Sequence, residues 1–411
     1  MRAHRFVVVL CLACAGTGRA PSPGATPVRP GIAVVLSDSA HLIAGKRLGL
    51  LTNHTGIDHL GRRDADLLLA AQGSGGRLTV LFSPEHGFRG TEDREGLPDG
   101  QDSATGLPIY SLYGGSRNAA RAALDSIDVL LIDLQDIGAR FYTYPATTAS
   151  LMRDASQAGK RVIILDRPNP VGGTAVQGNV RAQLAEPDSN LVGFLPVAMR
   201  HGMTLGELAL MANDLMGLKL DLTVVPALGW KRAQFYDETG VPWIKPSPNM
   251  PSLESAVLYP GLCLFEGTNL SVGRGTPIAF QVLGAPWLDP VKLSERLRTF
   301  EVAGVEIVDS TFTPLAPTDG KYPGVALPGI RLRVTDRERF DPTRFAVVVL
   351  AALRFTHPDK FEFRARHFDR LATGPELRSA IEAGRSPSEI WESWEPDLIR
   401  FREMRKKYLI Y

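Results

Sequence analysis

The chain has 411 residues, and its length and apolar content predict a soluble globular protein of two domains rather than one compact core. Lysine and arginine number 46 and aspartate and glutamate 44, so the formal net charge is only +2. No basic run with interleaved aromatic residues is present in the sequence, and this excludes nucleic acid as an expected partner.

Residues 1–20 have the layout of a secretory signal, with a basic start, an apolar stretch and then small residues. The apolar stretch is too short to span a membrane, so we expect an exported mature chain without a transmembrane helix, periplasmic or extracellular. Lipidation of Cys14 is the alternative, although Cys11 stands where that signal has an aliphatic residue. Residues 21–30 are rich in proline and predict an unstructured tether. Only Cys263 lies clearly in the folded part, so no intramolecular disulfide is expected.

In residues 31–230, short apolar runs alternate with amphipathic stretches, which indicates a mostly parallel sheet flanked by helices. The runs are almost continuously apolar, as expected for strands buried on both faces. Thr204 and Glu207 form a capping box, which predicts the start of a helix that ends at Gly217. The expected strands are Arg47–Asn53, Leu78–Ser83, Asp128–Leu134, Arg161–Asp166 and one within residues 220–228, and the expected helices lie within residues 62–73, 116–127 and 147–159.

The pattern changes after about residue 230, and we assign residues 231–411 to a second domain. Residues 230–290 are rich in proline, glycine and aromatic residues with little periodicity, and they predict a long functional loop. The rest predicts helices at Pro290–Ala303 and Pro342–Phe355, strands at Val305–Phe312 and Gly329–Thr335, and a pair of helices from Pro375 onward.

Four consecutive predicted strands are followed by short polar clusters, and ligands of open α/β sheets bind outside the carboxyl ends of the strands. Glu85 is the best candidate for chemistry, because Pro84 and Gly87 make its turn without it. The polar residues that follow these strands are Asn53 and His54, Glu85 and His86, Asp136 and Arg140, and Asn169.

Local roles remain open for several of these residues. Asp136 is also a candidate helix cap, Arg140 a candidate to neutralise nearby carboxylates, and His54 and His86 can be neutral hydrogen-bonded residues. The sequence contains no serine nucleophile elbow, P-loop, dinucleotide fingerprint or HExxH pattern. The remaining chemistry is that of carboxylates among aromatic residues such as Tyr142, and this combination suits glycoside hydrolysis.

Several long motifs occur in order along the chain: LTNHTGID, LFSPEHGFRG, SLYG, DLQDIGARFYTY, LDRPNPVGG, HGMTLGELA, KPSPNMP, YPGLCLFEGTNLSVGRGT and RKKYLIY. In these motifs the chain resembles the NamZ-type exo-β-N-acetylmuramidases. The resemblance implies a Rossmann-like domain with a mostly parallel sheet, a smaller C-terminal α/β domain and an active site in the cleft between them. It also implies release of N-acetylmuramic acid from the non-reducing ends of peptidoglycan fragments, with no metal or organic cofactor.

On this resemblance, Glu85 is the candidate acid/base, and the adjacent His86 is a further catalytic candidate. Asp136 and Glu266 are the contenders for the second catalytic group, and we rank Asp136 first. The substrate-binding candidates are Asn53, His54, Arg140, Tyr142, Asn169, Glu266, Asn269 and Arg274.

Muramic acid differs from glucosamine by a lactyl carboxylate, which the planar fork of an arginine matches. Arg140 and Arg274 are the candidates for this contact, with Arg89 as a third. The expected partners are peptidoglycan-derived saccharides, and the sequence identifies no protein partner. The alternative function is a periplasmic sugar-binding or muropeptide-binding protein without turnover, which predicts two similar domains, whereas the two halves of this sequence differ.

Overall fold

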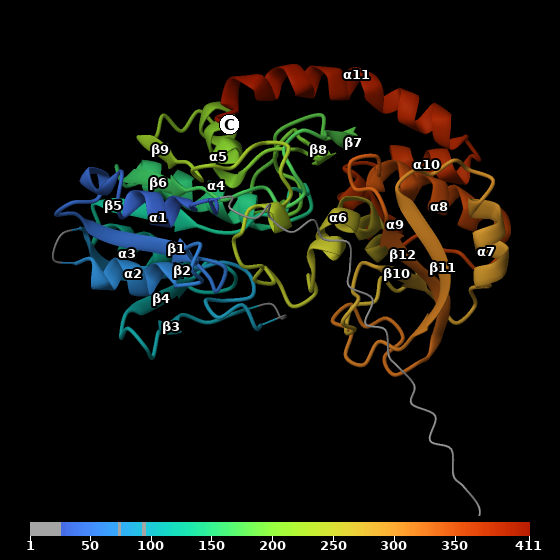
Figure 1. Ribbon diagram of the computed structural model, residues 1–411, viewed down its shortest axis with the longest axis horizontal. Coiled ribbons are helices and arrows are strands. Elements are labelled where there is room, and N and C mark those ends of the chain that lie inside the picture. Colours follow the sequence, from blue (N-terminus) through green and yellow to red (C-terminus); the bar gives the residue numbers. More distant parts are fainter. Residues whose placement is uncertain (1–25, 73–74, 93–95) are drawn as a thin grey trace, which may run out of the picture.

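The larger of two parts in the computed structural model, which describes residues 26–72, 75–92 and 96–411, is built on a seven-stranded sheet (Figure 1). The strand order is β3-β4-β2-β1-β5-β6-β9, and every neighbouring pair is parallel except β3 with β4. Without the short edge strand β3, this is the order of a doubly wound Rossmann sheet, so the predicted fold class is confirmed. The strands are β1 Arg47–Thr52, β2 Arg77–Ser83, β3 Gly100–Gln101, β4 Pro108–Ser111, β5 Val129–Asp133, β6 Arg161–Leu165 and β9 Leu222–Val225.

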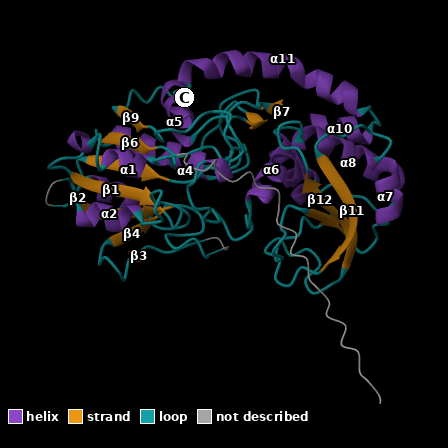
Figure 2. Cartoon of the chain, viewed as in Figure 1, coloured by secondary structure: helices purple, strands orange, loops and turns teal. Residues whose placement is uncertain are grey.

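Helices cover both faces of this sheet (Figure 2). Successive strand residues point to opposite faces, so Leu50 packs in one core with Ile32 and Leu68 from the helices on that side. Leu51 packs in the other core, which includes Met152. The helices are α1 Gly31–Val35, α2 Asp64–Ala70, α3 Arg117–Leu124, α4 Tyr144–Gln157 and α5 Leu205–Leu215, with the short 3-10 turn η1 Ala40–Leu42.

The second part is a smaller antiparallel sheet of order β10-β12-β11, with helices packed against it (Figure 1). A separate antiparallel pair, β7 with β8, lies in the chain between β6 and α5. The elements are β7 Gln177–Val180, β8 Ala198–Arg200, η2 Tyr236–Glu238, α6 Leu253–Leu262, η3 Cys263–Gly267, β10 Val282–Gly284, α7 Pro290–Leu297, β11 Val305–Phe312, β12 Leu327–Val334, α8 Pro342–Thr356, α9 Ala365–Ala372, α10 Glu376–Glu382, α11 Pro387–Arg405 and η4 Lys406–Tyr408.

The expectation of a long loop at residues 230–290 is wrong, because α6, η3 and β10 lie inside that stretch. Eight of the ten residues of α6 are buried, so the helix has no polar face to give its sequence an amphipathic period, and Pro260 lies within it. Residues 231–250, which the sequence assigned to the second domain, pack partly on the first. There the backbone N–H of Tyr236 donates to the Pro170 carbonyl at 3.1 Å.

The predicted signal, with Cys11 and Cys14, lies outside the described residues, as does the tether up to residue 25. Residues 28–30 are not an unstructured tether, because Val28 is buried and Arg29 pairs with Leu228 through two backbone hydrogen bonds. Within the described ranges, none of the helices combines the length and the apolar character needed to cross a bilayer.

The C-terminal residues return to the first domain after α11, which runs along one side of both parts (Figure 1). The Tyr411 hydroxyl donates to Asp166 Oδ2 at 2.8 Å and accepts from the backbone N–H of Ala227 at 2.8 Å. The backbone N–H of Ile410 donates to Glu207 Oε1 at 3.0 Å. The end of the chain therefore closes the first domain beside the carboxyl end of β6.

We predict that Tyr411→Phe lowers the free energy of unfolding by about 1–3 kcal/mol, the usual cost of leaving buried polar groups without a partner. Burial raises the pKa of Asp166 in the folded protein to about 6. Because this lies above its unfolded value, ionisation of Asp166 lowers stability as the pH rises through about 6. Loss of a donor to the carboxylate raises that pKa further, so the variant should lose more stability at about pH 8 than at about pH 5.

Urea unfolding of both proteins at the two pH values measures this effect. Tyr408→Phe is the matched control, because it removes a hydroxyl that donates to the exposed Asp214 from the same tail. Equal losses for Tyr411→Phe at both pH values would contradict the assigned role of Asp166.

Candidate active site

The carboxyl ends of the parallel strands bring the predicted polar residues to one edge of the first sheet. Asn53 and His54 follow β1, which pairs with β2 on one side and β5 on the other. The chain leaves β1 in one direction and returns to its other side at β5, so this is the topological switch point, where doubly wound proteins bind ligands.

Glu85 follows β2 and is half-buried. The Thr143 hydroxyl, at the start of α4, donates to Glu85 Oε2 at 2.5 Å. His86 has a left-handed backbone with φ of 70°, a costly conformation for a residue other than glycine. Its Nδ1 lies 2.7 Å from the Glu92 carbonyl, which can only accept, so Nδ1 carries a proton. The hydrogen bond of His86 to the Glu92 carbonyl therefore fixes the turn that contains Glu85.

His54 packs directly on the loop that follows Glu85. A Cβ atom at Gly90 would lie 1.8 Å from the His54 ring, so only glycine fits there. His54 Nε2 lies 2.6 Å from the Lys245 carbonyl and therefore donates to it. Burial lowers the pKa of His54, and the neighbouring His86 lowers it further. His54 is thus a neutral imidazole that ties the first strand end to the segment that contains Lys245.

Tyr144, in the first turn of α4, links several of these residues. Its hydroxyl donates to the Pro246 carbonyl and accepts from Asn53 Nδ2, each at 2.7 Å. Burial raises the pKa of Tyr144, and the negative charges of Glu85 and Asp136 raise it further. Both candidate catalytic carboxylates therefore lie close enough to Tyr144 to act on it.

Asp136 follows β5 and is buried. Its Oδ2 accepts from the backbone N–H of Gly138 at 2.8 Å, and Oδ1 has no hydrogen-bond partner among the described residues. His201 Nε2 lies 3.5 Å from the same Oδ2. His201 Nδ1 accepts the backbone N–H of Met203, so in the neutral ring the proton lies on Nε2, which faces Asp136. Asp136 thus stabilises its own turn through Oδ2, whereas Oδ1 is an acceptor without a donor among the described residues.

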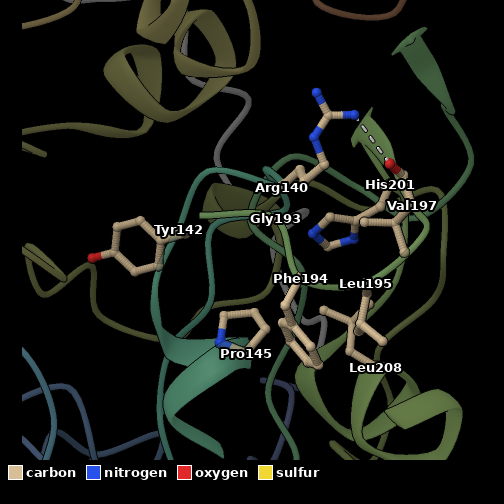
Figure 3. Close-up of a pocket in the computed structure, with 9 residues that line it drawn as sticks. All are labelled: Arg140, Tyr142, Pro145, Gly193, Phe194, Leu195, Val197, His201 and Leu208. Carbon is tan, nitrogen blue, oxygen red and sulfur yellow. Dashed lines mark hydrogen bonds between the residues drawn. The ribbon is translucent and has the colours of Figure 1, made fainter. Parts of the chain in front are cut away.

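The structure places Arg140 differently from the expected carboxylate contact. Its Nη1 donates to the carbonyls of Asn179 and Val197, and its Nη2 donates to Asn179 Oδ1 and to the Leu371 carbonyl. The four N–H groups of Nη1 and Nη2 are therefore used, Nε has no hydrogen-bond partner among the described residues, and the side chain connects the two parts of the chain. Figure 3 shows Arg140 beside His201 in a narrow hollow, with Tyr142 pointing away from it.

Asn169 and Asn269 also have structural partners. Asn169 Nδ2 donates to the Met203 carbonyl and its Oδ1 accepts from the backbone N–H of Val171. Asn269 binds the backbone of Lys360 and Glu362 in the same two-sided way. Both amides are thus engaged by the protein itself, and the substrate-binding role expected of Asn169 and Asn269 stays a prediction.

Glu266 and Arg274 form an ion pair in the second part, in η3 and in the loop that follows it. Burial raises the pKa of Glu266, but the charges of Arg274 and Lys321 outweigh it and hold the pKa below its usual value. Arg274 lies over the Phe280 ring, 5.5 Å from its centroid. Glu266 therefore already has a cationic partner, Arg274, which favours the charged form of its carboxyl group.

Aromatic rings connect this ion pair to Tyr144. The ring centroids are 4.7 Å apart from Tyr144 to Tyr142, 6.4 Å from Tyr142 to Tyr259 and 4.7 Å from Tyr259 to Phe280. The Tyr142 hydroxyl is buried and makes no well-directed hydrogen bond within the described part of the chain. Tyr142 is therefore part of an aromatic wall between the strand-end residues and Arg274.

Comparison with known protein families covers nearly the whole chain. Residues 48–254 match the family described as exo-β-N-acetylmuramidase NamZ, N-terminal, and residues 257–411 match its C-terminal counterpart. The chain belongs to the NamZ family. The resemblance seen in its motifs is thereby confirmed.

Relatives support the same assignment. The chain is 40% identical over 388 residues to the peptidoglycan β-N-acetylmuramidase NamZ of Bacillus subtilis (strain 168), covering 93% of this chain and 91% of that protein. Two solved structures of DUF1343 family proteins from Bacteroides fragilis NCTC 9343 have TM-scores of 0.84 and 0.75 and identities of 32% and 33%. Each match covers 94% of this chain and 99% of the solved one.

Three residues of the candidate site were not among the sequence candidates: Thr143, Tyr144 and His201. All three lie within or beside motifs that carry the family resemblance, DLQDIGARFYTY and HGMTLGELA, so the signal was present. Their roles depend on contacts from distant parts of the chain, which the motifs alone do not show. Across the residues that the structure describes, no cluster of three or more His, Cys, Asp or Glu side chains is arranged to hold a metal ion.

Proposed function

We propose that this protein is an exo-acting glycoside hydrolase that releases N-acetylmuramic acid from the non-reducing ends of peptidoglycan fragments. The support is membership of the NamZ family and the Bacillus subtilis relative named as a peptidoglycan β-N-acetylmuramidase. The observation that carries the proposal is the position of Glu85, a half-buried carboxyl group next to the switch point of the sheet.

Glu85 is the proposed general acid. Thr143 donates to Oε2, and no other described residue is seen to hydrogen-bond the carboxyl group, which leaves Oε1 for the glycosidic oxygen. Proton donation to that oxygen allows the bond to the anomeric carbon to break, and a second carboxylate supports the positive charge that develops or activates water. Asp136 is the proposed second group, because its buried Oδ1 is an acceptor to which no described residue donates.

A sugar-binding protein without turnover is the less favoured function. That alternative predicted two similar domains, whereas the structure combines a seven-stranded and a three-stranded sheet. The relative of this chain in Bacillus subtilis is also named as an enzyme.

We predict that Glu85→Gln lowers turnover of an aryl β-N-acetylmuraminide by about a hundredfold or more, the usual scale for loss of an acid/base group. The amide oxygen of glutamine still accepts from Thr143, so folding should be unchanged. Thr143→Val is the matched variant: it keeps the carboxyl group, loses only its donor and should have a smaller effect. Near wild-type turnover of Glu85→Gln, with the same melting temperature, would rule out Glu85 as the acid.

Arg274 remains the predicted reader of the lactyl carboxylate. Loss of a charge-assisted contact costs about 1.5–3 kcal/mol, so Arg274→Ala should lose roughly ten- to a hundredfold in kcat/KM on the muraminide. The matched glucosaminide lacks the carboxylate and should be almost unaffected. Arg140→Ala is the contrasting variant, since its partners are in the protein and its loss should affect stability and both substrates alike. Equal losses on the two sugars for Arg274→Ala would remove it as the reader.

We also propose that the protein is exported, which rests on the signal-like residues 1–20 alone. The mature chain should begin between Ala15 and Pro21, or at a lipidated Cys14. Amino-terminal sequencing and intact mass of the envelope fraction distinguish the two. An envelope or secreted form that retains Met1 would contradict export through a cleaved signal.

A further inference from the structure

A hollow of about 230 Å³ lies between the start of α3, one side of α4 and the loop before β8. The end of β4 and the residues after it, 111–115, form one wall of the hollow. This segment contains the SLYG motif. Arg117, Thr147, Ser150 and Asp188 are among its polar lining residues. The hollow is thus formed by a strand end that belongs to the same edge as the candidate active site.

Two connections place this hollow next to Glu85. β4 pairs in parallel with β2, with Ser111 beside Ser83, and the Leu112 N–H donates to the Ser83 carbonyl at 2.9 Å. On the other side, Thr147 lies one helical turn beyond Thr143, which donates to Glu85. The hollow therefore begins one strand and one helical turn from the proposed acid.

The hollow extends away from Glu85 along α4. Its lining residues on this helix run from Thr147 to Asp154, seven residues apart and so about 10 Å long at the rise of an α-helix. This length suits one pyranose ring with its substituents. A substrate cleaved at its non-reducing terminal sugar continues only on the leaving side, and the general acid lies on that side because it protonates the leaving oxygen.

The floor of the hollow is an ion-pair network. Arg117 contacts Asp188 at 2.7 Å and Asp154 at 3.1 Å, and the Ser150 hydroxyl donates to Asp188 at 2.5 Å. The whole network contains three arginines and three carboxylates: Arg117, Arg121 and Arg153 with Asp154, Asp188 and Glu186. Its charges balance, so it favours a neutral ligand with many hydroxyl groups over a charged peptide.

We propose that this hollow is the leaving-side sugar subsite and binds the neutral N-acetylamino sugar whose hydroxyl group is released by the cleavage. Arg117 is its central contact, because it orients both carboxylates through Nη1 and Nη2 and, among the described residues, one N–H of Nη1 is left to donate to a sugar oxygen. The proposal rests on the proposed function, since it extends the same catalytic site by one sugar.

The test compares two substrates that share the muramic acid ring. One is the disaccharide of N-acetylmuramic acid linked to N-acetylglucosamine, and the other is an aryl β-N-acetylmuraminide, whose leaving group has no sugar hydroxyl groups. Arg117→Ala should raise KM for the disaccharide by about tenfold, the effect of losing a hydrogen bond from a charged group, and change the aryl substrate little. Arg121→Ala is the matched control, because Arg121 also pairs with Asp154 from α3 but does not line the hollow.

Ser150→Leu is a second variant that fills the hollow without removing a charge, and it should act on the disaccharide alone. The subsite is rejected if both variants change the two substrates equally, or if Arg121→Ala has the same selective effect as Arg117→Ala. An inactive wild-type protein on the aryl substrate would instead overturn the proposed function, so the two failures are distinguishable.

Discussion

The parallel pairing of β2, β1 and β5 is the constraint on which the rest of the site depends. These three strands are buried almost throughout, so their register is fixed by packing on both faces. A shift of one residue would move every apolar side chain to the opposite face. Because the register cannot shift, the residues that follow the strands are held at fixed positions along one edge. Glu85 and Asp136 therefore reach the same region from strands that are not adjacent in sequence.

The second part of the chain is held to this edge by buried hydrogen bonds. Burial lowers the pKa of Arg140 to about 9, which shows how unfavourable its position is for a charge. Four hydrogen bonds to Asn179, Val197 and Leu371 offset that cost. Lys321, also buried, donates to the carbonyls of Phe265, Glu266 and Leu270 and fixes the segment that contains Glu266. Arg140 thus ties the second part to the first domain, and Lys321 fixes the segment of Glu266 within the second part.

The sequence predicted the parallel strands well because burial on both faces leaves a direct trace, a continuous apolar run. The sequence did not predict α6, because a helix that is buried on nearly all sides has no amphipathic period. β4 has only four residues and was not predicted, although its carboxyl end supplies a wall of the hollow beside Glu85.

At the level of single residues, the sequence located the strand-end positions but could not assign every side chain. Glu85, His54 and Asp136 lie where the sheet topology places them. The motifs predict substrate contacts for Arg140 and Asn269, yet most of their hydrogen-bond partners are backbone groups, up to 231 residues away in the chain. Such contacts leave no periodic or local signal, so only the folded structure separates a binding arginine from a structural one.

Asp136 and Glu266, the two candidates for the second catalytic group, have different electrostatic surroundings. Glu266 is held in its charged form by Arg274, and a carboxylate that shares a cation is a poor base and a poor nucleophile. Asp136 has no cationic partner at hydrogen-bond distance among the described residues, and its neighbour His201 presents an N–H that can orient the carboxylate. The Asp136 Oδ1 atom is buried without a partner, which is costly in a folded protein unless a ligand or water satisfies it. On these grounds we propose Asp136 as the reacting carboxylate and Glu266 as the group that holds Arg274 in place.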